Sequence, residues 1–247
     1  MTLDVAGVLR DAWTMAKRDR EVLVGVGGVL ILVPEIAQAM FVTAPPALPA
    51  SPSDPAAVQV WMEAVAVWSR HNDALLLVSS AVALFGTLVL FLLYTDRERP
   101  DVTGALTTGL AIVPRYILLA MAVALPVNIG TLFLLVPGFY LKGRLLPIGP
   151  LFVAERPIGV LAAWRRSFAL TRGNALVLMG LACVPLIGGD LLAMPCEMLG
   201  KTLNGAPMAN PVAAAALDIG VGLGRTIGVI AAILLEVALY RRLRIGI

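Results

Sequence analysis

The chain has 247 residues, of which 59% are hydrophobic and only 14% are charged, with a formal net charge of +3 at pH 7. Soluble domains carry about 25% charged residues, so this composition argues against a water-soluble domain and indicates a chain that folds in a lipid bilayer. The basic residues flank apolar runs, which is typical of topology signals and argues against nucleic acid as a partner.

A membrane-spanning helix needs about 20 largely apolar residues. Six runs approach or exceed this length, and they lie at Val22–Val42, Ala74–Tyr94, Tyr116–Val136, Gly138–Ala154, Ala175–Met194 and Ala213–Tyr240. The sequence therefore predicts an all-α integral membrane bundle of six transmembrane helices, with residues 1–247 forming a single domain.

Amphipathic segments precede three of the predicted hairpins. Residues 3–17 place apolar side chains on one helical face, namely Val5, Leu9, Ala12, Trp13 and Ala16. Residues 101–113 and Ile158–Thr171 have similar faces, so we predict three interfacial helices on the cytoplasmic side. Each helix shares a short Gly-x-Leu core and precedes two spans, which predicts three helix-plus-hairpin repeats at residues 1–98, 99–155 and 156–247.

A further short helix is predicted after the first span. The Pro-rich stretch Thr43–Asp54 reads as an aqueous loop, and Asp54 followed by Pro55 is typical of a helix start. Trp61 and Trp68 lie on the apolar face of this helix. We expect it to rest on the outer membrane surface through these tryptophans.

The distribution of Lys and Arg predicts the orientation. With the N-terminus in the cytoplasm, that side holds almost all basic residues near span ends, whereas the outer loops hold Arg70 and Lys201. Positive residues favour the cytoplasmic side of a membrane. We therefore expect a multi-pass protein of the bacterial inner membrane with both termini in the cytoplasm.

Charged residues inside spans are the candidate functional residues, because each costs about 2.5–3.5 kcal/mol at a helix centre. Six of them are predicted in the outer half of the membrane: Glu35, Lys142, Arg144, Asp190, Asp218 and Arg225. One interpretation is a pocket for an anionic headgroup or a small solute. The alternative is that Lys142 and Arg144 reach the outer headgroups while the others form structural ion pairs.

The last span has two periodic patterns. Asp218, Arg225 and Glu236 are spaced so that they share one face pointing into the bundle. Gly220, Gly224 and Gly228 recur every fourth residue, which predicts close packing against another helix.

No motif for catalysis or cofactor binding is recognisable. Cys183, Cys196 and His71 have no neighbours at metal-ligand spacing, and the sequence shows no nucleophile elbow, phosphate-binding glycine loop or His-centred acid–base group. We therefore predict no catalytic, cofactor-binding or metal-binding residue and no enzymatic activity.

The stretch Leu135–Asn174 carries a recognisable pattern. It consists of a Pro-Gly-aromatic-Tyr-Leu segment, a returning span that ends in Glu, and then Arg-Ser and Leu-Thr-x-Gly; its members here include Pro137, Gly138, Tyr140, Glu155, Arg166, Ser167, Thr171 and Gly173. This pattern resembles a bacterial inner-membrane family of unknown function with about six spans, related to the membrane domain fused ahead of some glycerophosphoryl diester phosphodiesterases. The resemblance implies a membrane location and a lipid or envelope setting, but no reaction.

The motif residues also suggest structural roles. Pro137 and Gly138 are expected to form a tight hairpin turn, and Glu155 is expected to meet the arginines of the following helix. Ser167 and Thr171 can bond either to helix carbonyls or to lipid headgroups.

These observations lead to two functional hypotheses. The first is a non-enzymatic protein with a lipid-associated or envelope-organising role, in which Arg165, Arg166 and Arg172 contact anionic lipids and a membrane protein is a further partner. The alternative is a transporter or permease for a small molecule or lipid that uses the intramembrane charges.

Overall fold

The computed structural model describes residues 3–96, 100–133, 135–204 and 210–245, and every regular element in these ranges is helical. Five of the described helical segments are long and apolar enough to cross a membrane, at Arg20–Phe41, Pro55–Thr95, Val102–Leu132, Ala175–Leu203 and Pro211–Arg244. The predicted all-α class is confirmed, and these helices indicate a multi-pass membrane protein.

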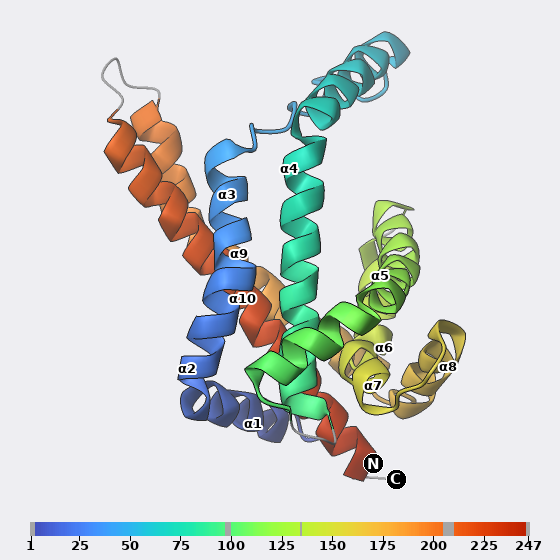
Figure 1. Ribbon diagram of the computed structural model, residues 1–247. Helices are drawn as coiled ribbons and strands as arrows, with labels where there is room; N and C mark the ends of the chain where they lie inside the picture. The colour runs from blue at the N-terminus through green and yellow to red at the C-terminus, as the bar shows by residue number, and fades with distance from the viewer. Residues whose placement is uncertain (1–2, 97–99, 134, 205–209, 246–247) are drawn as a thin grey trace.

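The N-terminal segment consists of α1 (Val5–Arg18), α2 (Arg20–Val22), the π-helix η1 (Leu23–Leu32) and α3 (Val33–Phe41). Helix α1 lies across one end of the bundle, and the chain then rises through α2, η1 and α3 (Figure 1). The side chain of Asp4 caps α1 by accepting the N–H of Gly7 at 3.0 Å. We call this end of the bundle, which also holds the last turns of the C-terminal helix, the α1 end.

The predicted apolar face of α1 is only partly correct. Val8, Ala12 and Met15 are buried, whereas Leu9 and Trp13 are exposed by 41% and 62%. The helix therefore has two apolar sides, one that packs on the protein and one that faces outward. A helix in the headgroup plane uses both, because it contacts protein on one side and lipid on another.

Helix α4 (Pro55–Thr95) joins the predicted outer helix and the second span in one 41-residue helix. Asp54 caps it as predicted, by accepting the N–H of Ala56 at 3.0 Å. The indole of Trp68 donates to the carbonyl of Thr43 at 2.7 Å, which ties the Pro-rich loop to α4. The first turns of α4 point away from the rest of the bundle (Figure 1).

Helix α5 (Val102–Phe133) is also longer than predicted, because it merges residues 101–113 with the third span. Its interior contains Pro114 and Pro126. Proline is tolerated in membrane helices when neighbouring groups satisfy the freed carbonyls. The first half lies across the bundle and the second half rises along it (Figure 1). The middle repeat therefore has no separate interfacial helix, and the threefold repeat stays a prediction.

The predicted fourth span, Gly138–Ala154, is wrong as a single helix. The structure has α6 (Leu135–Leu145) and α7 (Ile148–Ala154), interrupted at Leu146 and Pro147. Pro147 and Pro150 lack the N–H groups that would continue the helix. Even so, the two short helices return the chain toward the α1 end, where the N- and C-termini lie together (Figure 1).

The expected hairpin turn at Pro137 and Gly138 is also wrong, because both residues lie in the first turns of α6. A Cβ at Gly138 would lie only 2.4 Å from the backbone nitrogen of Thr131 in α5. Gly138 therefore serves the close approach of two helices and not a turn.

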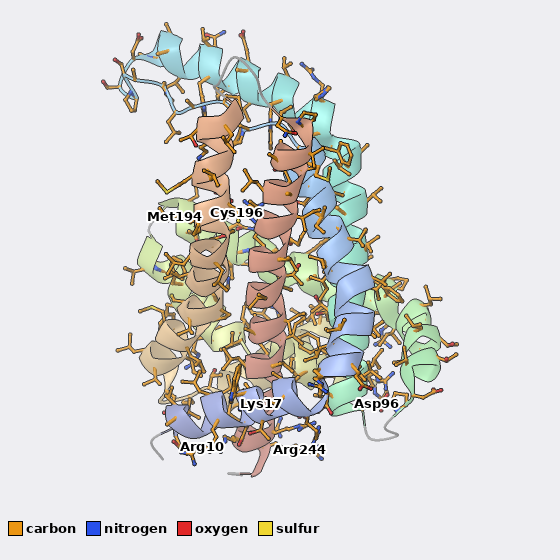
Figure 2. The ribbon with its side chains drawn as sticks, turned by 90° about the vertical axis from the view of Figure 1, so that its left-hand side faces the viewer. Arg10, Lys17, Asp96, Met194, Cys196 and Arg244 are labelled. Carbon is orange, nitrogen blue, oxygen red and sulfur yellow. The ribbon has the colours of Figure 1, made fainter. Side chains whose placement is uncertain are left out.

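The remaining helices are α8 (Val160–Leu170), α9 (Ala175–Asn204) and α10 (Pro211–Ile245). Helix α9 continues past Met194, the predicted end of the fifth span, and through Pro195. Residues 205–209, which follow α9 in the chain, lie outside the described part. Helix α10 packs against α1, η1, α3, α4, α7 and α9, and is the central element of the bundle. Figure 2 shows α9 and α10 side by side, with α1 crossing their lower ends.

The glycine stripe of α10 packs as predicted. A Cβ at Gly228 would lie 2.7 Å from the Cα of Gly189, and one at Gly224 would lie 2.6 Å from the backbone nitrogen of Ala193. These distances allow no side chain, so the backbones of α9 and α10 are in direct contact.

Candidate intramembrane binding site

Four of the six predicted pocket residues line one cavity of about 390 Å³ between α3, α6, α9 and α10. They are Glu35, Lys142, Asp190 and Arg225, and Glu236 joins them from α10. Thr87 of α4 adds a hydroxyl to the lining. The structure thus brings together charged residues from four helices that are far apart in the sequence.

The charged face of α10 links this central cavity to two others. Asp218 lines an outer cavity of about 710 Å³, and Arg225 lines both the outer and the central cavity. Glu236 and Lys142 line the central cavity and an inner cavity of about 370 Å³. The predicted inward stripe is therefore confirmed, and its three residues follow one another along consecutive cavities.

Ion pairing in these cavities is incomplete. Arg225 forms an ion pair with Glu197 of α9 at 2.8 Å. Glu35 interacts electrostatically with Arg225 and Asp190, and Glu236 interacts with Lys142. The central cavity has three carboxylates and two basic groups, one of which is already bound to Glu197. Its lining therefore has more carboxyl groups than basic groups.

The inner cavity has fewer charged residues in its lining than the central cavity. Asn128 of α5 is a polar member of its lining, and aromatic rings of Phe91 and Tyr116 form part of its wall. The ring of Phe91 occupies the space over Gly149, where a Cβ would lie 2.4 Å from the ring. Lys142 and Glu236 are thus the charged residues that the central and the inner cavity share.

Arg144 does not belong to this site, which corrects the prediction. Its guanidinium donates to the carbonyl of Phe168 at 2.7 Å and of Thr171 at 3.4 Å, and it stacks over the Phe168 ring at 4.8 Å. The last carbonyls of a helix have no partners within that helix. Arg144 satisfies these groups at the end of α8, which is why it is drawn away from the other charges.

The structure places Lys142 in the lining of the central cavity, as the pocket interpretation predicts. It was expected in the outer half, reaching the outer headgroups in the alternative interpretation, but it lines the cavity walls beside Glu236. Glu236 is five residues before Arg241, or about 8 Å along the axis of α10. Lys142 therefore lies toward the α1 end of the bundle.

The motif hydroxyls bond to helix carbonyls and not to headgroups. Ser167 and Thr171 are fully buried. Ser167 donates to the carbonyl of Arg144 at 2.8 Å, whereas Thr171 donates to the carbonyl of Ser167 at 2.7 Å and lies 3.2 Å from that of Arg144. This carbonyl lies just before the interruption between α6 and α7. Gly173 follows with a φ of +85°, a backbone conformation that favours glycine and ends α8.

The expected contact of Glu155 is confirmed. Its carboxylate lies 3.5 Å from Nε of Arg166 and accepts a hydrogen bond from the Tyr240 hydroxyl at 3.3 Å. Tyr140 is 41% exposed. The motif therefore fixes α8 to α6, α7 and α10, which is a structural role for most of its residues.

Sequence reasoning missed Glu197 and Thr87 as members of the cavity linings. Glu197 follows Pro195 in a segment that was expected to be a loop, and Thr87 is a common helix residue without a signal of its own. Among the described residues, no group of three His, Cys, Asp or Glu side chains is placed to hold a metal ion. No family model matches this chain, and no solved structure matches it.

Proposed function

We propose that this protein is a permease for a small cationic solute, which enters the central cavity. The observation that carries the proposal is the series of cavities along α10, in which Asp218, Arg225 and Glu236 follow one another through the bundle. Charges inside a membrane are costly, and proteins keep them mainly along solute or ion pathways.

The larger number of carboxyl groups in the central cavity favours a cationic solute. Glu35, Asp190 and Glu236 outnumber Lys142 and Arg225, and Arg225 is engaged by Glu197. An uncompensated carboxylate in an apolar surrounding is stabilised by a bound cation. The pocket for an anionic headgroup is less well supported, because Arg144 binds α8 and Glu236 takes part in the cavity.

Uptake into proteoliposomes tests this proposal, with the purified full chain and a panel of choline, tetramethylammonium, Na⁺ and chloride. We expect uptake of at least one cation and not of chloride. Glu236→Gln should lower that uptake at least tenfold, because it removes a carboxyl group from the central and the inner cavity. The control Glu63→Gln changes an exposed carboxylate in the first turns of α4 and should leave uptake unchanged. Equal uptake by wild type and Glu236→Gln would contradict the proposal.

A lipid-associated, non-enzymatic role is the second candidate, in the inner membrane of a bacterium with the α1 end in the cytoplasm. Basic residues support it, since Arg10, Lys17 and Arg244 all lie at this end (Figure 2). Arg165 and Arg172 of the α8 segment are exposed and available to anionic lipids. The resemblance to the six-span inner-membrane family agrees with this setting and stays a prediction.

A further inference from the structure

The outer and the central cavity meet at one ion pair. Arg225 is the one described residue that lines both cavities, and its partner Glu197 lines the outer cavity. Nη2 of Arg225 lies 2.8 Å from Oε1 of Glu197, which joins α10 to α9. Thr43, Ala44 and Pro45 of the Pro-rich loop also line the outer cavity, so this cavity lies toward the end of the bundle opposite the α1 end (Figure 1). The pair therefore stands between that end and the central cavity.

The ion pair is not rigidly enclosed. The side chains of Arg225 and Glu197 are 38% and 35% exposed. Ion pairs with such exposure contribute little to stability, because water solvates the separated charges. Partly exposed side chains also change rotamer quickly. Arg225 and Glu197 can therefore separate while both helices stay folded.

A second carboxylate lies on the central side of Arg225. Glu35 of α3 lines the central cavity and interacts electrostatically with Arg225. The backbones of α3 and α10 are in contact beside these residues, because a Cβ at Gly222 would lie 3.0 Å from the backbone nitrogen of Ile36. An unpaired charge inside a membrane protein is costly. An exchange of Glu197 for Glu35 keeps Arg225 paired, so the same side chain has two arrangements.

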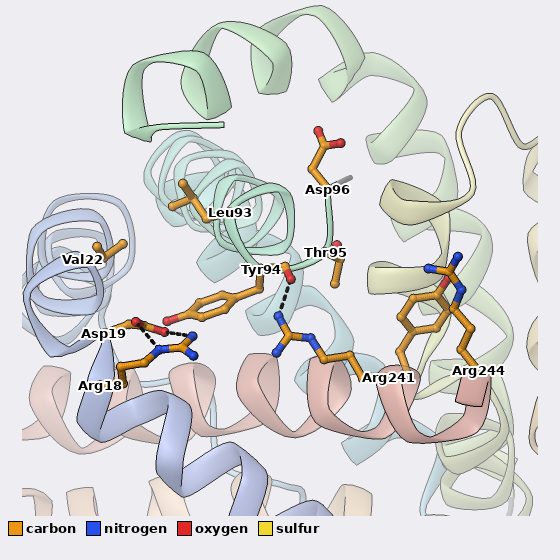
Figure 3. Close-up of a pocket in the computed structure, with 10 residues that line it drawn as sticks. Arg18, Asp19, Val22, Leu93, Tyr94, Thr95, Asp96, Arg241 and Arg244 are labelled. Atoms are coloured by element: carbon orange, nitrogen blue, oxygen red, sulfur yellow. Dashed lines mark hydrogen bonds and ion pairs between the residues drawn. The ribbon is translucent and has the colours of Figure 1, made fainter. Parts of the chain in front are cut away.

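The other end of α10 is held in place. Arg241 donates to the carbonyl of Tyr94 at 2.6 Å, which joins α10 to α4 (Figure 3). Arg242 donates to Asp4 and Asp11, which joins α10 to the α1 segment. Because α10 is bound to two other parts of the chain here, we expect access to the central cavity to change at the opposite end of α10, where Arg225 lies.

We propose that the ion pair of Arg225 and Glu197 is a gate between the outer and the central cavity. The gate is closed while Arg225 is bound to Glu197, and it opens when the Arg225 side chain turns to Glu35. This inference rests on the proposed permease function, since it assigns the step that admits the solute to the central cavity. The gate is measurable without a solute, because its opening exposes the central cavity to a small reagent.

Labelling of a cysteine in the central cavity tests the gate in the full chain. Ala232→Cys, in a Cys183→Ala/Cys196→Ala background, places a thiol in the lining of this cavity, seven residues after Arg225 on α10. The reagent is an impermeant methanethiosulfonate that carries a trimethylammonium group. It is added to sealed membrane vesicles from the side that labels Ser53→Cys in the Pro-rich loop. The reagent then reaches the thiol by way of the outer cavity.

Glu197→Gln should raise the labelling rate at least fivefold, because Arg225 loses the partner that keeps the gate closed. Glu35→Gln should lower the rate, since it removes the partner of the open gate. Opposite changes in these two variants exclude a general loosening of the fold, which would raise the rate in both. Asp218→Asn is the matched control, because it removes a carboxyl group from the outer cavity but leaves the pair intact, and it should not raise the rate.

A charge exchange is the second test of the pair. Arg225→Glu/Glu197→Arg restores an ion pair between α9 and α10 but prevents the turn to Glu35, so its labelling rate should be at or below the wild-type rate. An unchanged rate in Glu197→Gln, or an equal rise in Asp218→Asn or Glu35→Gln, would overturn the gate.

The labelling and uptake experiments separate the two proposals. A higher labelling rate in Glu197→Gln that the charge exchange reverses would support the gate even if proteoliposomes took up no cation, and that result would contradict the permease alone. Cation uptake together with an unchanged labelling rate in Glu197→Gln would contradict the gate alone.

Discussion

Single hydroxyl groups join α8 to the point where the returning chain is interrupted. Ser167 is fully buried and donates to the Arg144 carbonyl at 2.8 Å, a bond that Thr171 supports at 3.2 Å. Ser167→Ala should lower the free energy of unfolding by about 1 kcal/mol, because it removes the shorter of the two hydrogen bonds to the Arg144 carbonyl. Reversible unfolding in mixed micelles measures the change. The exposed Ser80→Ala is the control, and an equal effect there would contradict the role of Ser167.

A second prediction at this scale concerns the acidic residues of α1. The N–H of Gly7 lowers the pKa of Asp4, with a further contribution from Arg242, and a hydrogen bond from Arg242 lowers the pKa of Asp11. Both pKa values thus lie below 3.8, the ordinary value. A carboxylate with a lowered pKa stabilises the fold above its ordinary pKa, and this stabilisation is lost as the pH falls through the folded-state pKa.

The contact between α1 and α10 should therefore be fully formed at neutral pH and weaken below about pH 4. Hydrogen exchange of the α1 amides, corrected for the intrinsic rate at each pH, measures this. Arg242 donates to Asp11 at 2.6 Å and to Asp4 at 3.0 Å, so Arg242→Gln should remove its contribution to both lowered pKa values and leave the effect of the Gly7 N–H on Asp4. An unchanged pH profile in this variant would show that other groups control the contact.

Among the elements, the pair α9 and α10 depends most on its glycines. A Cβ at Gly228 would meet the backbone of Gly189 at 2.7 Å, so Gly228→Ala should destabilise the protein by about 1–3 kcal/mol. A Cβ at Gly188, the neighbour of Gly189, would have no other atom within 4 Å. Gly188→Ala should therefore be neutral or stabilising by up to about 1 kcal/mol, because alanine favours helices. Thermal unfolding in detergent should show a lower melting temperature for Gly228→Ala and an unchanged or higher one for Gly188→Ala.

The helices also indicate what hydropathy can predict. The face of α10 that holds Asp218, Arg225 and Glu236 followed from spacing alone, because the residues belong to one helix. The sequence predicts the start of α4 and the second span as separate helices, but the polar residues between them, His71, Asn72 and Asp73, lie within one continuous helix. The partners of Arg144 were not predictable, since they depend on where α8 packs after the interruption at Pro147.

The whole molecule places both termini at the α1 end (Figure 1). Five continuous spans would separate the termini across a membrane, so α6 and α7 must carry the chain back. In a Cys183→Ala/Cys196→Ala background, Thr14→Cys and Arg244→Cys should react with an impermeant maleimide from one side of the membrane. Ser53→Cys, in the loop before α4, should react from the other. If Arg244→Cys and Ser53→Cys reacted from the same side of the membrane, this path of the chain would be contradicted.

The interrupted return path has a consequence for how the chain enters the bilayer during synthesis. Helix α6 has 11 residues, which cover about 16 Å, or roughly half of a 30 Å hydrocarbon core. Such a segment cannot partition into lipid by itself. The backbones of Gly130 and Gly138 are close enough for α5 and α6 to associate first, since a Cβ at Gly130 would lie 3.1 Å from the Cα of Gly138. We therefore expect α5 and α6 to leave the insertion machinery as one paired unit.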